Sequence, residues 1–186
     1  KKTVAAFLSS VLLLGVSAVT RADAQNVRLP SRFVPGDAAI SAAANGQSMP
    51  SLAQGGSTVL AVWSDNRGNP IGGYEGETSK DILGVRLDGA GNVLEAVPFV
   101  VAAGPGTQDR PRAAWNGTNW LVVYESVDRN GTGYYTSSLE ALRVSPSGQV
   151  LDPKPIKIYN VVPVGATWAV ASDGSQWVIA IQSTSV

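Results

Sequence analysis

Carboxylates are the side chains in this chain with the clearest capacity for catalysis. Six of them lie in or beside two polar segments, 64–81 and 125–138: Glu75, Glu77, Asp81, Glu125, Asp128 and Glu140. Two carboxyl groups held roughly 5 to 10 Å apart can hydrolyse a glycosidic bond. Acidic residues in such polar segments are more often solvated surface charges. We therefore expect no catalytic site, and we keep a fragment of a carbohydrate-active enzyme as one alternative.

Several other kinds of catalytic site are excluded by composition. The sequence contains no histidine and no cysteine, which rules out a Ser-His-Asp triad, a Cys-His dyad and the usual zinc sites. It also lacks a GxxxxGKS or GxxxxGKT motif and a GxGxxG motif after a strand, so these phosphate-binding loops are absent. A protein that is not an enzyme fits this composition best.

The two polar segments have a composition that favours binding instead. Both contain Asp, Arg, Asn, Gly and Tyr, and long loops on a rigid scaffold often hold binding residues. Tyrosine rings with polar neighbours suit sugar recognition. We therefore predict that an extracellular glycan or protein is bound by Asp65, Arg67, Tyr74, Asp128, Arg129 and Tyr134. In the alternative interpretation, the Asp, Asn and Gly residues only form turns.

Calcium is a second possible ligand of these segments. Residues 65–68 and 128–131 resemble fragments of calcium loops, which place oxygen ligands around a glycine turn. Neither fragment is followed by the bidentate glutamate or the full ligand set of such a loop. We expect no cofactor and keep calcium as an alternative.

An internal repeat predicts the elements that position these segments. Residues 49–63 align without a gap on residues 110–124 at an offset of 61, and residues 168–181 follow at an offset of 57 from the second copy. Self-similarity at a fixed period is typical of an array of one supersecondary unit. Trp63, Trp120, Tyr124 and Trp177 recur at fixed repeat positions, so we expect them to pack between units rather than to stack on a ligand.

Each repeat has the pattern of four antiparallel strands. Continuous apolar runs at 59–63 and 120–124 suit strands buried on both faces, and glycine turns join each to a short preceding strand. Strand, turn and strand are expected at 82–94 and 139–151, and a last strand at 98–102 and 155–159. A further outer strand is expected at 38–42.

Four strands in about 60 residues are typical of a β-propeller blade. We therefore predict an all-β, β-propeller-like repeat domain at 38–186, with units at about 49–109, 110–166 and, in part, 167–186. A propeller needs roughly four to eight blades, and this chain has between two and three. We expect it to be part of a longer protein; assembly of copies and an open stack are the alternatives.

The first residues have the pattern of an export signal. Lys1 and Lys2 precede an apolar stretch at 4–19, and residues 22–24 (Ala-Asp-Ala) fit a cleavage site. The stretch is shorter than the ~20 apolar residues of a membrane span. We expect a signal peptide at 1–24, a linker at 25–37, and a secreted, periplasmic or cell-surface protein that meets a membrane only through the uncleaved signal.

The charge balance limits the partners. Lys plus Arg and Asp plus Glu are equal at 14 each, and no run is rich in Lys or Arg. Nucleic-acid binders depend on a basic surface, so nucleic acid is excluded as an expected partner. Without cysteine there are no disulfides, so the fold depends on its apolar core.

Two strings carry a resemblance to known proteins. Residues 114–124 followed by 142–152 resemble the propeller-type repeats of large proteins secreted by bacteria. Residues 172–177 are similar to the Asp-box of sialidase-type propellers, although two of its spacings are one residue shorter here. These resemblances imply extracellular placement, an all-β repeat fold and a turn-stabilising role for the box. The function expected is non-enzymatic binding; a structural or self-assembling repeat is the other alternative.

Overall fold

The computed structural model describes residues 46–66, 80–104, 106–129, 135–162 and 166–182. These residues form ten β-strands and no helix. Within them there is accordingly no helix with the length and apolarity to cross a membrane. The expected all-β class is confirmed for this part of the chain.

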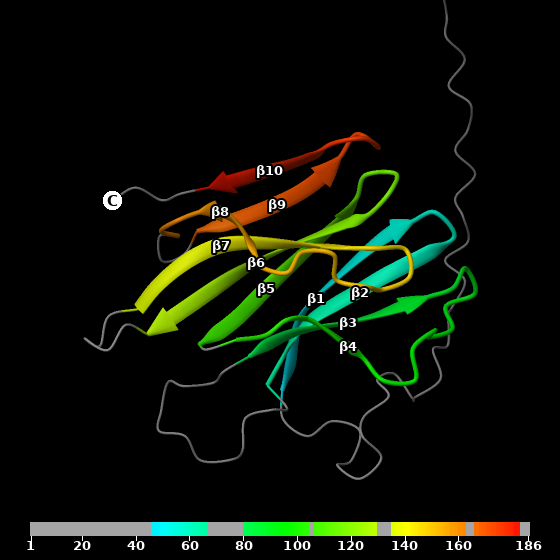
Figure 1. Ribbon diagram of the computed structural model, residues 1–186, viewed down its shortest axis with the longest axis horizontal. Helices are drawn as coiled ribbons and strands as arrows, with labels where there is room; N and C mark the ends of the chain where they lie inside the picture. The colour runs from blue at the N-terminus through cyan, green and yellow to red at the C-terminus, as the bar shows by residue number, and fades with distance from the viewer. Residues whose placement is uncertain (1–45, 67–79, 105, 130–134, 163–165, 183–186) are drawn as a thin grey trace, which may run out of the picture.

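The strands form three antiparallel sheets (Figure 1). The first sheet has the order β1-β2-β3-β4, from β1 (Gln47–Gly55), β2 (Thr58–Asp65), β3 (Asp81–Leu87) and β4 (Phe99–Ala102). The second sheet repeats this order with β5 (Thr107–Trp115), β6 (Trp120–Arg129), β7 (Tyr135–Val144) and β8 (Ile156–Tyr159). The third sheet pairs β9 (Thr167–Ser172) with β10 (Trp177–Gln182). No sheet closes on itself among these strands.

The hairpin turns follow from local side-chain chemistry. Asn116 Oδ1 accepts hydrogen bonds from the backbone N–H groups of Thr118 and Asn119, at 3.1 and 2.9 Å. Asp173 Oδ1 does the same for Ser175 and Gln176, at 2.8 Å each. Short polar side chains stabilise turns in this way, so the Asp-box-like string forms the turn between β9 and β10.

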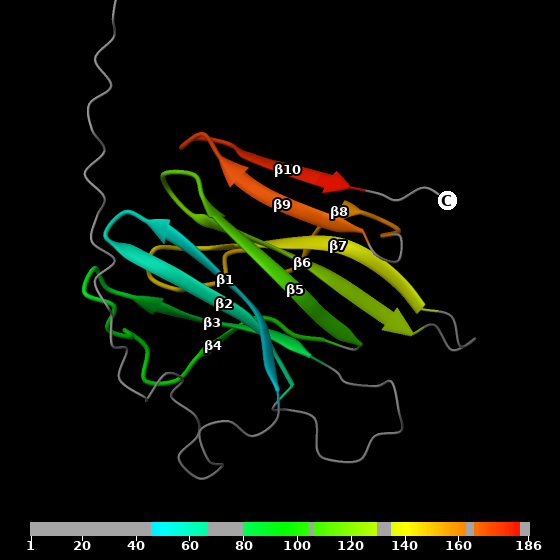
Figure 2. The same cartoon turned by 180° about the vertical axis from the view of Figure 1, so that it is seen from behind.

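The sheets stack face to face, with the second sheet between the first and the third (Figure 2). We call the face that each sheet turns toward the following sheet its front face, and the opposite face its back face. The front face of the first sheet packs on the back face of the second; the residues are Leu60, Val62 and Ile82 against Trp120, Val122 and Tyr124. The front face of the second sheet packs on the third; the residues are Leu121, Val123 and Leu139 against Trp177, Ile179 and Ile181.

The two interfaces are equivalent in the repeat. Trp120 Nε1 donates a hydrogen bond to the carbonyl of Ala53 in the first sheet, at 3.0 Å. Trp177 Nε1 donates to the carbonyl of Ala114 in the second sheet, also at 3.0 Å. These tryptophans occupy the same repeat position, and so do the two alanines. The predicted packing of Trp120, Tyr124 and Trp177 between units is confirmed, but the same prediction is wrong for Trp63, which packs on Leu83 and Val85 of its own sheet.

Two expectations about the strands are wrong. The segment 125–138 is not one loop, because β6 and β7 stay paired from Glu125↔Leu139 to Arg129↔Tyr135. Backbone hydrogen bonds extend the hairpin through polar residues that carry no strand periodicity. In addition, the expected strands after the turns at 88–92 and 145–149 are reduced to single bridges, Leu87↔Val93 and Val144↔Val150.

Candidate functional site

Three of the predicted binding residues, Asp65, Asp128 and Arg129, lie at one end of the stack, which we call the long-loop end: the end at which β2 finishes at Asp65 and β6 finishes at Arg129 (Figure 1). Asp128 is exposed on β6. Arg129 is the last residue of β6, and its backbone pairs with Tyr135. The other predicted residues, Arg67, Tyr74 and Tyr134, lie outside the described residues, as do Glu75 and Glu77.

Asp65 lies inside the sheet rather than in a loop. Its side chain is 1% exposed, and Oδ2 accepts a hydrogen bond of 2.8 Å from Trp63 Nε1. Asp81 is its cross-strand partner. Burial, together with the charge of Asp65, raises the pKa of Asp81, although a backbone hydrogen bond from Gly104 opposes this shift. These two carboxylates therefore form an acidic pair at the base of the long-loop end.

A repeated backbone irregularity shapes this end. Strands β1 and β5 each contain a bulge, between Ser48 and Ser51 and between Asp109 and Arg112. Within the bulges Met49 and Arg110, which share a repeat position, have φ angles of 53° and 57°. A residue other than glycine in this left-handed region costs on the order of 1 kcal/mol or more, and bulges redirect side chains.

Arg110 gains three contacts from this redirection. Its guanidinium forms an ion pair with Glu125, with 3.1 Å between Nη1 and Oε2. Nη2 donates to the carbonyl of Ala166 at 2.7 Å, and the guanidinium lies 4.4 Å from the ring centroid of Trp168, a favourable cation–π distance. Glu125 also accepts a 2.5 Å hydrogen bond from Ser137 Oγ. Arg110 thus joins the second sheet to the third.

A second ion pair joins the first sheet to the second. Lys80 Nζ lies 2.8 Å from Asp109 Oδ2, and Ser64 Oγ accepts a 3.1 Å hydrogen bond from the backbone N–H of Arg110. Burial would raise the pKa of Asp109, but hydrogen bonds from Lys80, Ser64 and the Arg110 N–H outweigh it, so the pKa is lowered. The base of the long-loop end is therefore a fixed polar network.

Glu140 and Glu125 also have structural partners. Glu140 accepts hydrogen bonds from Tyr124 Oη at 3.3 Å and from Ser138 Oγ at 3.1 Å. Burial of the ring, then the charge of Glu140, raises the pKa of Tyr124. Glu125 is held by Arg110, so both glutamates have partners within the fold. The described residues contain no group of three or more possible acidic metal ligands.

Sequence reasoning missed the importance of Arg110 and Asp109. Arg110 aligns with Met49, so the repeat gives no hint of an ion pair at this position. Its contacts depend on the positive φ of the bulge, which the residue type does not reveal. Lys80 and Asp109 are 29 residues apart in the chain, and only the stacking of two sheets brings them together.

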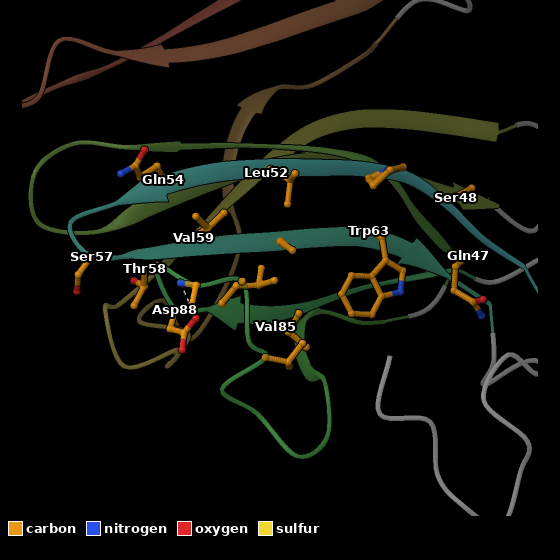
Figure 3. A pocket seen from close by; sticks show the side chains of 17 residues that line it. Gln47, Ser48, Leu52, Gln54, Ser57, Thr58, Val59, Trp63, Val85 and Asp88 are labelled. Atoms are coloured by element: carbon orange, nitrogen blue, oxygen red, sulfur yellow. Dashed lines mark hydrogen bonds between the residues drawn. The ribbon is translucent and has the colours of Figure 1, made fainter. Parts of the chain in front are cut away.

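A second feature, a hollow of about 740 Å³, lies on the back face of the first sheet. Figure 3 shows Leu52, Val59, Trp63 and Val85 along its wall, with Asp88 at one side. Leu52 is 68% exposed, whereas Trp63 packs with Leu83 and Val85 in a small apolar cluster. The wall is thus a largely apolar sheet face with polar groups only at its edges.

Comparisons with protein-family models, curated proteins and solved structures find no match to this chain.

Proposed function

We propose that this chain is a secreted, non-enzymatic, propeller-type repeat module that binds an extracellular glycan or protein through its long-loop end. The observation that carries this proposal is the common end at which β2 and β6 finish (Figure 1). The connections that follow them, 66–80 and 130–134, contain the predicted residues Arg67, Tyr74 and Tyr134. Loops carried on a rigid scaffold commonly hold binding residues.

The polar network supports the rigid-scaffold part of this proposal. Lys80–Asp109 and Arg110–Glu125 join the three sheets at the base of the long-loop end. Both pairs are partly buried, so they hold the strand ends in one arrangement better than exposed pairs would. Connections that leave such a base start from fixed positions, which lowers the entropy cost of ordering them around a ligand.

The propeller-type part of the proposal rests on the stacking. Successive sheets use equivalent front and back faces, and the first strand of each sheet contacts the first strand of the next, β1 with β5 and β5 with β9. Adjacent first strands are expected where sheets are arranged around an axis. The non-enzymatic part rests on Glu125 and Glu140, whose carboxylates are held by neighbours in the fold.

A glycan array probed with the full chain tests the binding proposal. Tyr74→Ala and Tyr134→Ala each remove one aromatic platform, and we expect each to weaken binding about fivefold, because a stacked ring contributes on the order of 1 kcal/mol. Tyr159→Ala is the matched control, since this exposed tyrosine lies on β8, outside both connections. Array binding that survives the Tyr74→Ala/Tyr134→Ala double variant at full strength would contradict the proposal.

A further inference from the structure

The two outer faces of the stack correspond, by repeat position, to the two halves of its internal interfaces. Inside the stack, a front face packs on a back face twice, at equivalent repeat positions. The back face of the first sheet and the front face of the third sheet contact no described sheet. The same repeat therefore defines what should cover each of them.

The back face of the first sheet is formed by repeat positions that are covered by a neighbouring sheet elsewhere in the stack. Its residues Val59, Ala61 and Trp63 correspond in the repeat to Trp120, Val122 and Tyr124. Those three residues of the second sheet are nearly fully buried by the front face of the first. Here the equivalent positions line the 740 Å³ hollow (Figure 3). Val59 and Ala61 are partly exposed, whereas Trp63, which packs on Leu83 and Val85, is only 8% exposed.

The front face of the third sheet is likewise formed by repeat positions that are buried in the second sheet. Val178 and Ala180 correspond to Leu121 and Val123 of the second sheet, which are buried against the third sheet. Val178 is 63% exposed, and Ala180 is also exposed. An apolar strand face with this pattern normally packs against another sheet.

We propose that a second copy of this chain covers both faces: the front face of its third sheet docks into the hollow on the back face of the first sheet, head to tail. One molecule carries, at equivalent repeat positions, both halves of an interface that it already uses twice, so a second copy supplies a matching face for each. The two faces are different surfaces, so the contact is heterologous, and a heterologous contact forms a ring when its rotation closes.

The ring that we propose contains two copies. Each copy has two four-stranded sheets and one two-stranded sheet among its described residues. Two copies therefore bring six sheets together, within the roughly four to eight blades that close a propeller. This closure rests on the propeller-type arrangement proposed above, whereas the docking itself rests only on the two faces. A discrete dimer is therefore the expected species, and not an open-ended polymer.

Light scattering of the full chain across a concentration series tests the dimer. Leu52→Asp places a carboxylate in the hollow, and Val178→Asp places one on the opposite face. Burying an unpaired charge is strongly unfavourable, so each variant should raise the dissociation constant at least about tenfold. Val97→Asp is the control, because this side chain is similarly exposed, at 65%, but lines neither face. Ala180→Glu repeats the front-face test at a second exposed position.

Mixing the two variants tests the head-to-tail geometry. The Leu52→Asp chain keeps an intact front face and the Val178→Asp chain an intact back face, so their 1:1 mixture should form a heterodimer at concentrations at which each variant alone is monomeric. A wild-type monomer at all concentrations, an unlimited polymer, a dimer unaffected by both variants, or a mixture that stays monomeric would overturn the proposal. A chain that dimerises but fails the glycan array refutes only the binding function.

Discussion

Gly55 is the position at which one added carbon should most disturb the stack. It ends β1 and is buried against the second sheet. A Cβ at this position would lie 2.6 Å from the ring of Trp120 and 2.7 Å from that of Trp115. The two rings cannot both withdraw, because they pack on each other with centroids 4.7 Å apart. Gly55→Ala therefore forces the first and second sheets apart locally.

Two contributions determine how much Gly55→Ala should lower the free energy of unfolding. Overpacking of a tight interface costs typically about 1–3 kcal/mol. A displaced Trp120 also lengthens the 3.0 Å hydrogen bond from its Nε1 to the carbonyl of Ala53, and such a bond contributes about 1 kcal/mol. We therefore expect Gly55→Ala to lower the free energy of unfolding by about 2–4 kcal/mol.

Urea unfolding followed by tryptophan fluorescence measures this loss. Gly46→Ala is the control, because a Cβ there meets nothing closer than 3.6 Å. In a double-mutant cycle, Trp120→Phe should relieve part of the clash, so the two changes should not be additive. A Gly55→Ala protein within about 0.5 kcal/mol of the wild type would refute the reasoning about the close approach of the sheets.

Three further predictions concern the long-loop end and the turns. Arg110→Met removes the ion pair with Glu125 and the contact on Trp168, so it should lower the free energy of unfolding by about 1–2 kcal/mol; equal urea midpoints would contradict this. Asp109→Asn and Asp81→Asn should change the pH dependence of the melting temperature in opposite directions. The lowered pKa of Asp109 stabilises the fold above its ordinary value of 3.8 and loses this effect as pH falls. The raised pKa of Asp81 instead destabilises the fold as pH rises through it, so Asp81→Asn should melt higher at pH 7. Asp173→Ala should lower the melting temperature by removing the acceptor of the β9–β10 turn. Asp173→Asn keeps an acceptor oxygen, so its melting temperature should stay close to that of the wild type.

The strands and their order could be predicted because their signals are local. Apolar runs such as 120–124 and turns such as 116–119 carry their own chemistry, and the repeat shows which runs are equivalent. The strand order in both four-stranded sheets then follows from short connections between antiparallel neighbours. The predicted last strands at 98–102 and 155–159 are confirmed to within one residue.

The long-loop end could be predicted only in part, because its geometry depends on contacts between distant residues. The sequence predicts that Asp65 lies in a loop, yet its Oδ2 accepts a hydrogen bond from Trp63 Nε1 inside the sheet. Glu125 reads as a loop carboxylate, yet it lies in β6 and pairs with Arg110. In both cases a polar side chain lies in a strand and interacts with a partner that cannot be predicted from the residue type.

The internal interfaces and the outer face of the first sheet differ in the residue found at one repeat position. Trp120 and Trp177 hydrogen-bond across the two internal interfaces, but the equivalent residue on the first sheet is Val59. An interface formed there gains apolar contact without the indole ring or its hydrogen bond. It should therefore be weaker than the internal ones, so two copies would separate on dilution while each stack of three sheets stays intact.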